Sequence, residues 1–379
     1  MFIRMLMATG LVAASAVAAP GDVLWRSPVG CHHWGPGCWI PHFSGTDGTP
    51  VVSRDGGTVV VGSYDGRVYA VDFDDGAQRW NASVDMGVGE GTPMVVGDCY
   101  VVCGLSEVRC LDAASGAVAW SARPGGQIGS CGGFDGTHVY VGTLRKELWA
   151  LHGANGSVAW RYEAGGELWA THGPRAVDGS SLLCLGVGGA ADVKENCSAT
   201  VDCVRRATGA PVWRQRTGIQ IQSTPVVSGA SLFVGDYDGC LYAFALEDGA
   251  ALWKSCTDGR LEASPTAVAA GGAPAVVVGS GDGFIYCFCA ADGERLWAFK
   301  AGRAVTTFTQ GGVGSTAAYD ARANVVYVGG PDAFFALDAD SGAAKWNHTV
   351  GKLVGSSPVL AEDRVFVGAE DGYLYAFAR

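Results

Sequence analysis

The chain has 379 residues, of which 58 are Gly, 48% are hydrophobic and only 17% are charged. This composition supplies a sizeable core and excludes a disordered chain. The formal net charge is −11 and no run of basic residues occurs, which argues against nucleic acid and anionic membrane surfaces as partners.

Residues 1–18 have the features of a secretory signal peptide. Arg4 precedes an apolar run over residues 5–14, and small residues follow at 15–18. The run is too short for a membrane span, which needs about 20 apolar residues. We therefore expect cleavage before Ala19, and a mature chain that is secreted or lies in the lumen of the secretory pathway. The alternative is a buried first strand.

The chain contains 13 cysteines, which fits an oxidising compartment where disulfides form. The number is odd, so at least one cysteine stays unpaired or pairs between chains. Cys31 and Cys38 lie seven residues apart in a segment rich in Gly, Pro and Trp, and they are candidates for a local disulfide. Zinc binding is the alternative use of cysteine, but no C-x-x-C sequence occurs.

A second candidate disulfide joins Cys103 and Cys110. Counting inward from each leaves residues 106–107 as a two-residue turn, which places the two cysteines opposite each other on paired strands. The alternative is a reduced pair in which Cys110 only fills a position that requires a small residue.

Asparagine gives an independent indication of secretion. The chain has five Asn, and four of them stand in N-x-S/T acceptor triplets for glycosylation. This pattern favours a glycosylating, eukaryotic secretory pathway. The alternative explanation is that Asn occurs in turns, where Ser and Gly are also common. The four acceptors are Asn81, Asn155, Asn196 and Asn347.

A repeat with a period of 40 to 53 residues runs through the chain. In each copy a small residue is followed by Gly six residues later and by Trp ten residues later, and this period is typical of propeller blades. We predict a structural role for these tryptophans, because a small side chain and a glycine without a side chain leave a flat surface on which an indole can pack. The complete copies contain Trp80, Trp120, Trp160, Trp213, Trp253, Trp297 and Trp346.

An eighth copy of the repeat is divided between the two ends of the chain. Ala376 has no Trp after it, and Trp25 near the N-terminus has no copy of the frame before it. If Arg379 were followed by Ala19, then Gly21 and Trp25 would complete the copy without a gap. We therefore predict that the N-terminal segment supplies the outer strand of the last blade, which leaves no open sheet edge in the ring.

The predicted fold is all-β: one eight-bladed β-propeller over residues 19–379, with four antiparallel strands in each blade. An inner segment ends in a Ser/Thr-Pro step in five blades, and Asp-Gly pairs mark tight turns between the second and third strands. We expect two-residue hairpins there, with calcium binding by the aspartates as the alternative. The aspartates of these turns are Asp65, Asp238, Asp282 and Asp371.

The repeat resembles that of a known family. The frame Ala-x-Asp-x-x-x-Gly-x-x-x-Trp, clearest at residues 70–80 and 336–346, is similar to the tryptophan-docking repeat of eight-bladed quinoprotein (PQQ-like) propellers. The resemblance covers the whole mature chain and implies an eight-bladed propeller. It also implies one of two functional classes: dehydrogenases that carry pyrroloquinoline quinone (PQQ) with calcium, or non-enzymatic propellers such as the bacterial outer-membrane assembly lipoprotein.

We predict a non-enzymatic scaffold that binds a protein or a small polar ligand, and no cofactor. The dehydrogenase class would imply adjacent cysteines and an Asn among the calcium ligands. The chain has no Cys-Cys pair, and its only Asn outside an acceptor triplet is Asn324. The alternative is a PQQ- and calcium-dependent quinoprotein dehydrogenase that oxidises alcohols or sugars. No G-x-S-x-G sequence indicates a catalytic serine, and we predict no catalytic residues.

Blade geometry indicates a candidate site in the central channel. The position three residues before each Ser/Thr-Pro proline should recur at one depth around the channel, and carboxylates, amides and hydroxyls occur there. A cation or polyol site is the functional interpretation, and a hydrated polar channel is the alternative. The candidates are Asp47, Glu90, Thr171, His172, Gln222 and Glu262.

Overall fold

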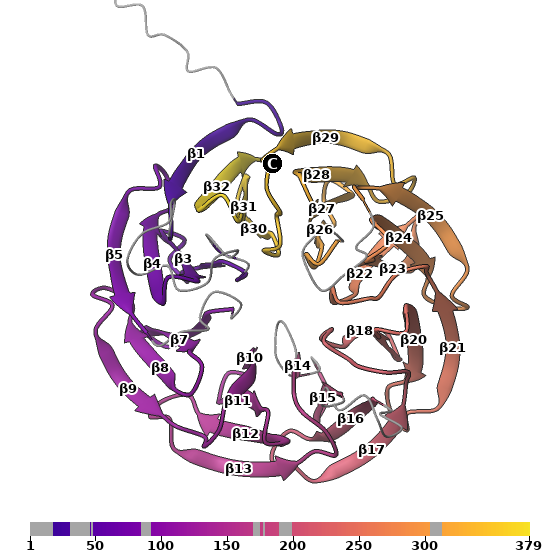
Figure 1. Cartoon of the computed structure of the whole chain (residues 1–379), viewed down its shortest axis with the longest axis horizontal. Helices are drawn as coiled ribbons and strands as arrows, with labels where there is room; N and C mark the ends of the chain where they lie inside the picture. Colours follow the sequence, from indigo (N-terminus) through magenta and orange to yellow (C-terminus); the bar gives the residue numbers. More distant parts are fainter. Residues whose placement is uncertain are drawn as a thin grey trace, which may run out of the picture.

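A computed structural model describes residues 18–30, 46, 48–84, 92–169, 175–176, 179–188, 199–303 and 313–379. Eight four-stranded antiparallel sheets stand side by side around a central axis, as the view along that axis shows (Figure 1). In each sheet the strands follow one another from the inside of the ring to the outside, which is the predicted eight-bladed propeller. No helix among these residues is long and apolar enough to cross a membrane.

The first four blades follow the chain from near its N-terminus. Blade 1 consists of β2 (Val51–Val52), β3 (Thr58–Ser63), β4 (Arg67–Asp72) and β5 (Gln78–Ser83). Blade 2 consists of β6 (Met94–Val96), β7 (Cys99–Cys103), β8 (Val108–Asp112) and β9 (Val118–Ala122). Blade 3 consists of β10 (Ile128–Phe134), β11 (His138–Thr143), β12 (Glu147–His152) and β13 (Val158–Glu163). Blade 4 consists of β14 (Arg175–Ala176), β15 (Leu182–Val187), β16 (Thr200–Arg205) and β17 (Pro211–Arg216).

The last four blades complete the ring. Blade 5 consists of β18 (Val226–Ser228), β19 (Ser231–Gly235), β20 (Cys240–Ala245) and β21 (Ala251–Cys256). Blade 6 consists of β22 (Thr266–Ala270), β23 (Ala273–Gly279), β24 (Phe284–Cys289) and β25 (Arg295–Lys300). Blade 7 consists of β26 (Ala318–Asp320), β27 (Val325–Gly329), β28 (Ala333–Asp338) and β29 (Ala344–Thr349). Blade 8 consists of β30 (Val359–Ala361), β31 (Arg364–Gly368), β32 (Tyr373–Ala378) and, on its outside, β1 (Val23–Pro28).

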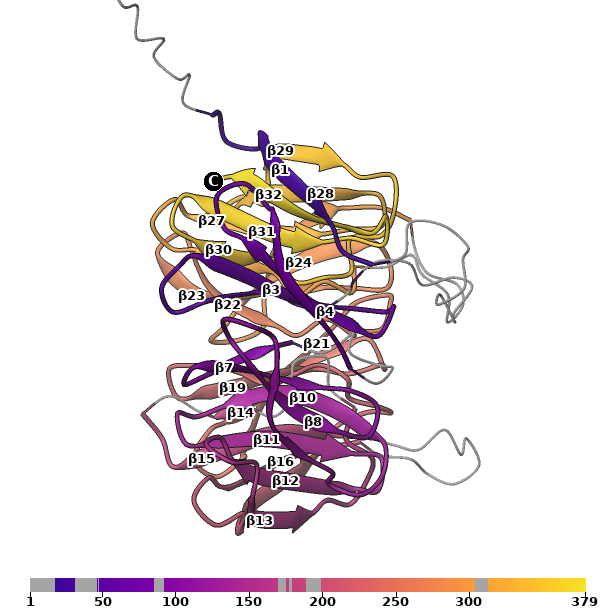
Figure 2. The same ribbon diagram turned by 90° about the vertical axis from the view of Figure 1, so that its left-hand side faces the viewer.

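The ring closes as the divided repeat predicts. The N-terminal strand β1 pairs antiparallel with the C-terminal strand β32, and Trp25 lies opposite Ala376 in their register. Both views show β1 beside β32 at the edge of blade 8 (Figures 1 and 2). The seven other tryptophans of the repeat lie opposite the small residue of their own blade in the same way.

Each indole also packs on the next blade, which the spacing of the repeat does not reveal. Trp25 lies on Gly76 of blade 1, where an added Cβ would come within 2.6 Å of the ring. Gly76 has a φ of 71°, which favours glycine, so both backbone angle and space exclude a larger residue. Around the ring, Trp346 of blade 7 lies on Gly21 of blade 8 in the same manner. Every blade is therefore joined to the next by an indole.

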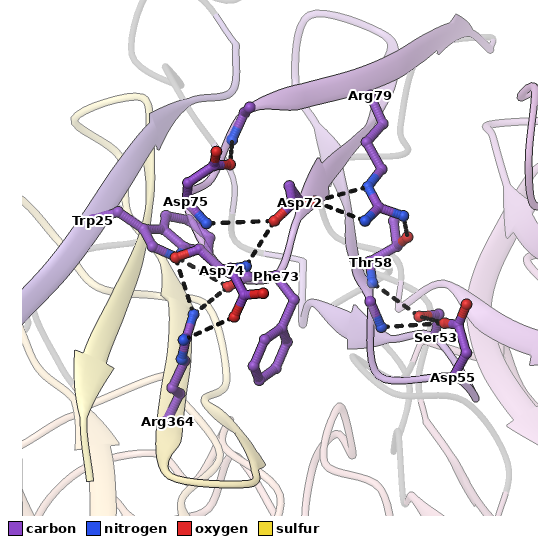
Figure 3. A network of polar contacts seen from close by, with 12 residues as sticks. Trp25, Ser53, Asp55, Thr58, Asp72, Phe73, Asp74, Asp75, Arg79 and Arg364 are labelled. Carbon is purple, nitrogen blue, oxygen red and sulfur yellow. Dashed lines mark hydrogen bonds and ion pairs between the residues drawn. The ribbon is translucent and has the colours of Figure 1, made fainter.

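The boundary between blades 8 and 1 shows how polar groups support this packing (Figure 3). The indole Nε1 of Trp25 donates a hydrogen bond of 3.0 Å to the carbonyl oxygen of Phe73. The guanidinium of Arg364 donates to the same carbonyl and to the carboxylate of Asp74, and it lies 4.6 Å from the centre of the Phe73 ring. One turn of blade 1 is thus held by two strands of blade 8.

The Asp-Gly turns are structural, although the predicted two-residue loop is wrong. Ser63 pairs with Arg67, so three residues form the loop and only Gly66 has a positive φ, of 78°. This is the three-residue hairpin that ends in a left-handed glycine. Asp65 accepts the Arg67 amide at 3.0 Å and the Tyr69 hydroxyl at 2.5 Å. The same Asp–Tyr contact recurs at 238/242, 282/286 and 371/375.

Blade 3 departs from this hairpin and provides a stability test. Lys146 occupies the position of the glycine and has a φ of 67°. A left-handed conformation costs an ordinary residue about 1–2 kcal/mol in the folded state. Glycine avoids this strain, but part of the gain is offset because glycine loses more backbone entropy on folding. We expect Lys146→Gly to raise the free energy of unfolding by about 0.5–1 kcal/mol, measured by urea denaturation. Lys146→Ala should show no such gain, and equal effects of the two would contradict the backbone explanation.

Four disulfides lie in the described part of the chain, and they correct one prediction. Cys103 is bonded to Cys131 and Cys110 to Cys99, so the predicted bond between Cys103 and Cys110 is wrong. The loop between β7 and β8 has four residues, which places Cys103 opposite Val108. Two further disulfides, 184–203 and 240–256, join neighbouring strands of blades 4 and 5. The candidates Cys31 and Cys38 lie outside the described residues.

The C-terminal residue holds blade 8 to blade 7. The Arg379 guanidinium binds the carboxylate of Asp320, whose side chain is 3% exposed, and donates to the carbonyl oxygen of Glu362 at 2.9 Å. This guanidinium holds the pKa of Asp320 below its ordinary value. The contact therefore contributes stability above the unfolded pKa of about 4 and loses it as the pH falls.

We expect Arg379→Ala to lower the free energy of unfolding by about 2 kcal/mol at pH 7, because it leaves a buried carboxylate without its cation. The difference from the wild type should shrink as the pH falls below about 4, where the carboxyl becomes neutral. Denaturant titrations at several pH values measure this. A difference that stays constant down to about pH 3 would contradict the role of Asp320.

Candidate functional site

A cavity of about 670 Å³ lies on the axis, where the inner strands begin. Its lining contains the Ser or Thr of five Ser/Thr-Pro steps, and the proline of each of these steps directly precedes an inner strand. The hydroxyl residues in the lining are Thr49, Thr92, Thr224, Ser264, Thr266, Thr316 and Ser357.

The hydroxyls of Ser264, Thr316 and Ser357 connect one blade to the next. The amide of Thr224 donates to Oγ of Ser264 at 2.9 Å, and the amide of Ser264 donates to Oγ1 of Thr316 at 3.0 Å. The amide of Thr316 in turn donates to Oγ of Ser357 at 3.1 Å. Inner strands of neighbouring blades are too far apart to pair as a sheet, so these side chains satisfy amides that would otherwise face the cavity. The hydroxyl lining is therefore part of the framework.

One end of the cavity is charged. Asp135 follows β10 and Arg206 follows β16, and the guanidinium Nε lies 3.4 Å from the carboxylate. Burial alone would raise the pKa of Asp135, but amide hydrogen bonds from residues 137 and 138 and the Tyr140 hydroxyl hold it below its ordinary value. His138 Nδ1 is buried without a hydrogen-bond partner, 3.8 Å from the same carboxylate.

This charged pair is not among the site residues predicted from the sequence. Asp135 lies in an ordinary-looking turn between first and second strands, which gives no signal of its own. Arg205 gives one, because it replaces the Asp that follows the small residue in the clearest copies of the repeat, and Arg206 is the next residue along the chain. A departure from the repeat was therefore the available indication.

The predicted channel residues are placed only in part. Asp47, Glu90, Thr171 and His172 lie outside the described residues. Gln222 and Glu262 are half-buried, and neither is in the cavity lining, which begins two residues further along the chain. Glu262 lies 3.3 Å from the guanidinium of Arg260. A ligand-binding role for these residues remains a prediction.

The donor groups of the described lining do not fit a calcium ion. Calcium takes about six to eight oxygen ligands, usually with several carboxylates. Asp135 is the only carboxylate in this part of the lining, and it is already bound by two amides, a hydroxyl and a guanidinium. The lining that the structure describes offers a polar, water-accessible surface with one ion pair.

Solved structures with this fold belong to proteins of very different kinds. BamB from Moraxella catarrhalis has 20% identity and a TM-score of 0.69 over 88% of this chain and 97% of that chain. The computationally designed Ika8 protein has 15% identity and a TM-score of 0.73 over 95% and 100%. The quinohemoprotein alcohol dehydrogenase ADHIIG from Pseudomonas putida HK5 has 13% identity and a TM-score of 0.66 over 94% and 76%. At these identities the similarity shows the fold alone.

A family model gives closer information than these structures. None of the curated proteins compared with the chain matches it in sequence. The family described as "Outer membrane protein assembly factor BamB" matches residues 8–105, 104–183, 164–285 and 281–379, which together cover nearly the whole chain. With its PQQ-like repeats folded into eight blades around a closed ring, the chain belongs to this BamB-like repeat family.

Proposed function

We propose that this protein is a secreted, non-enzymatic scaffold that binds other proteins. The observation that carries the proposal is the use of cavity hydroxyls as hydrogen-bond acceptors between blades, together with an Asp135 carboxylate that is already bound by two amides, a hydroxyl and a guanidinium. Hydroxyl oxygens that accept bonds from neighbouring blades serve the framework of the ring, and the enclosed carboxylate has its proton-accepting sites occupied by its neighbours. Membership in a family described as an assembly factor supports the same function.

Disulfides and acceptor asparagines support the secreted location. Four disulfides in the described part of the chain are typical of an oxidising compartment. Among the acceptors, Asn155 lies exposed in the turn after β12, and Asn347 lies exposed on the outer strand β29. Asn81 on β5 is half-buried beside Arg67, and Asn196 is outside the described residues.

Glycosylation can be measured on protein secreted from eukaryotic cells. Treatment with a glycosidase that removes N-linked glycans should reduce the mass, and Asn347→Gln should remove one glycan, because this exposed side chain is accessible to the transferase. Secreted protein without any glycan would contradict this part of the proposal.

The scaffold function is tested by cross-linking and enzyme assays on the same preparation. Chemical cross-linking of the full chain in its native secretory fraction should give a partner protein at constant stoichiometry. The quinoprotein alternative is tested after addition of PQQ and calcium, by dye-linked oxidation of alcohols and sugars. Oxidation at turnover rates typical of enzymes would overturn the scaffold proposal, as would the absence of any stoichiometric partner.

A further inference from the structure

The hairpin of blade 3 departs in two ways from the hairpins of blades 1, 5, 6 and 8. Arg145 and Lys146 stand where four other blades have Asp-Gly, and Lys146 keeps a left-handed backbone without being glycine. Trp149 stands where those blades have the tyrosine that bonds to the turn aspartate. Strained positions that deviate from a repeat are often retained for binding, which makes this turn a candidate for part of an interaction surface.

The turn lies in a continuous surface across blades 2 and 3, which are neighbours in the ring (Figure 1). The segment 123–127 connects the two blades. Its neighbour Ile128 donates its amide to the Leu105 carbonyl at 2.8 Å, and the Gln127 carbonyl accepts the Leu144 amide at 2.9 Å. The side chain of Arg145 packs on Gly126, where an added Cβ would come within 2.8 Å of its Cδ.

An aromatic ring and an arginine extend the surface along blade 3. The Arg161 guanidinium lies 5.0 Å from the centre of the half-buried Trp149 ring. The Lys146 carbonyl accepts the Ala164 amide at 2.8 Å, which joins the turn to the end of the same outer strand. We name this area the blade 2–3 surface and define it by six residues: Leu105, Arg123, Arg145, Lys146, Trp149 and Arg161.

The blade 2–3 surface carries four cations, on a protein whose formal net charge is −11. Arg123 lies 3.5 Å from Glu107, and Arg161 lies 3.7 Å from Glu147, so these two cations have a carboxylate nearby. Arg145 and Lys146 are both exposed, and neither forms an ion pair with any residue that the structure describes. Two adjacent cations without a counter-charge attract carboxylates and repel each other.

We propose that the blade 2–3 surface binds an acidic segment of a partner protein that also carries a large aliphatic side chain. Carboxylates of the segment would pair with Arg145 and Lys146, and its apolar side chain would contact Leu105, which is 39% exposed, and the Trp149 ring. Arginine and tryptophan are among the residues that most often dominate protein interfaces. This inference rests on the proposed scaffold function and specifies the surface and chemistry of the partner.

The direct test uses a peptide as the probe. A fluorescein-labelled peptide in which Asp and Glu residues flank a single Leu is titrated with the full mature chain, and binding is followed by anisotropy. We expect saturable binding that weakens as salt is raised from about 0.05 to 0.3 M, since exposed charges are screened over about 6–14 Å in that range. The matching peptide with Lys in place of the acids should not bind. Absence of binding by the acidic peptide, or equal binding by the basic one, would overturn the proposal.

A charge-matched pair of variants locates the binding. Arg145→Glu with Lys146→Glu should weaken binding about tenfold or more, because attraction becomes repulsion. The control is Arg54→Glu with Arg322→Glu, which makes the same charge change on exposed turns of the opposite face, after β2 and β26. An equal loss in the control would show only the effect of net charge and would contradict a site on blades 2 and 3.

A second variant separates binding from folding. Lys146→Gly removes one cation and relieves the backbone, so it should bind the acidic peptide more weakly while melting at or above the wild-type temperature. Unchanged affinity would overturn a role for Lys146. In the cross-linking experiment, a chain with both Arg145→Glu and Lys146→Glu that keeps its partner refutes this surface and leaves the scaffold function standing. A wild-type chain without a partner refutes the scaffold function itself.

Discussion

A chain that begins at Pro28 should melt about 10 °C or more below one that begins at Ala19, because it lacks the outer strand of blade 8. Trp25 alone contributes on the order of 3–5 kcal/mol, the usual cost of deleting a buried Trp side chain. Its ring packs on Gly76 and lies 5.6 Å from the Phe366 ring, and its Nε1 bonds to Phe73.

Removal of β1 also exposes the edge of β32, whose free amides and carbonyls can pair with another chain. We therefore expect loss of monomer in light scattering together with the lower melting temperature. Val23→Thr is the control, because this β1 side chain is 38% exposed and its change leaves the strand pairing intact. Identical melting curves for the chains that begin at Pro28 and at Ala19 would contradict closure by β1.

The second large effect concerns the disulfide between blades 2 and 3. Replacement of Cys103 and Cys131 together by Ala should lower the free energy of unfolding by about 3 kcal/mol, because the bond closes a loop of 28 residues in the unfolded chain. It also cross-links β7 to β10 of the next blade, beside Val101 and Val141 in the same buried cluster. Denaturant unfolding measures the change.

The control for this pair is Cys289→Ala, because Cys289 is not bonded and is half-buried. It should change the free energy of unfolding by less than about 1 kcal/mol. Peptide mapping without reduction should recover a fragment that contains Cys103 linked to one that contains Cys131. Recovery of Cys103 linked to Cys110, or of both as free thiols, would contradict the pairing.

The architecture could be predicted because the repeat records local requirements. A small residue must face each Trp across one strand pair, and a glycine must stand at a left-handed position, so both appear at fixed distances along the chain. Even the divided copy at the ends obeyed this spacing, and the pairing of Trp25 with Ala376 confirmed it. Spacing does not reveal, however, that the indole rests on the glycine of the following blade.

Contacts between residues of different blades could not be predicted from the spacing of residues along the chain. Cys103 has a closer neighbour along the chain in Cys110, but the register of β7 and β8 separates them by two positions and the partner comes from blade 3. The pair of Asp135 and Arg206 likewise joins turns of two blades. Such contacts depend on the rotation between neighbouring sheets, which no residue pattern within one blade specifies.

The hydrogen bonds between the two ends of the chain have a consequence for topology. The Gly21 amide donates to the Ala378 carbonyl, and the Ala378 amide donates to the Asp22 carbonyl, both at 2.9 Å. A short linker from Arg379 to Ala19 could therefore join the ends while an exposed turn elsewhere is opened. Such a circular permutant would keep every indole packed on its glycine. We therefore expect it to fold into the same closed ring, although its blades are synthesised in a different order.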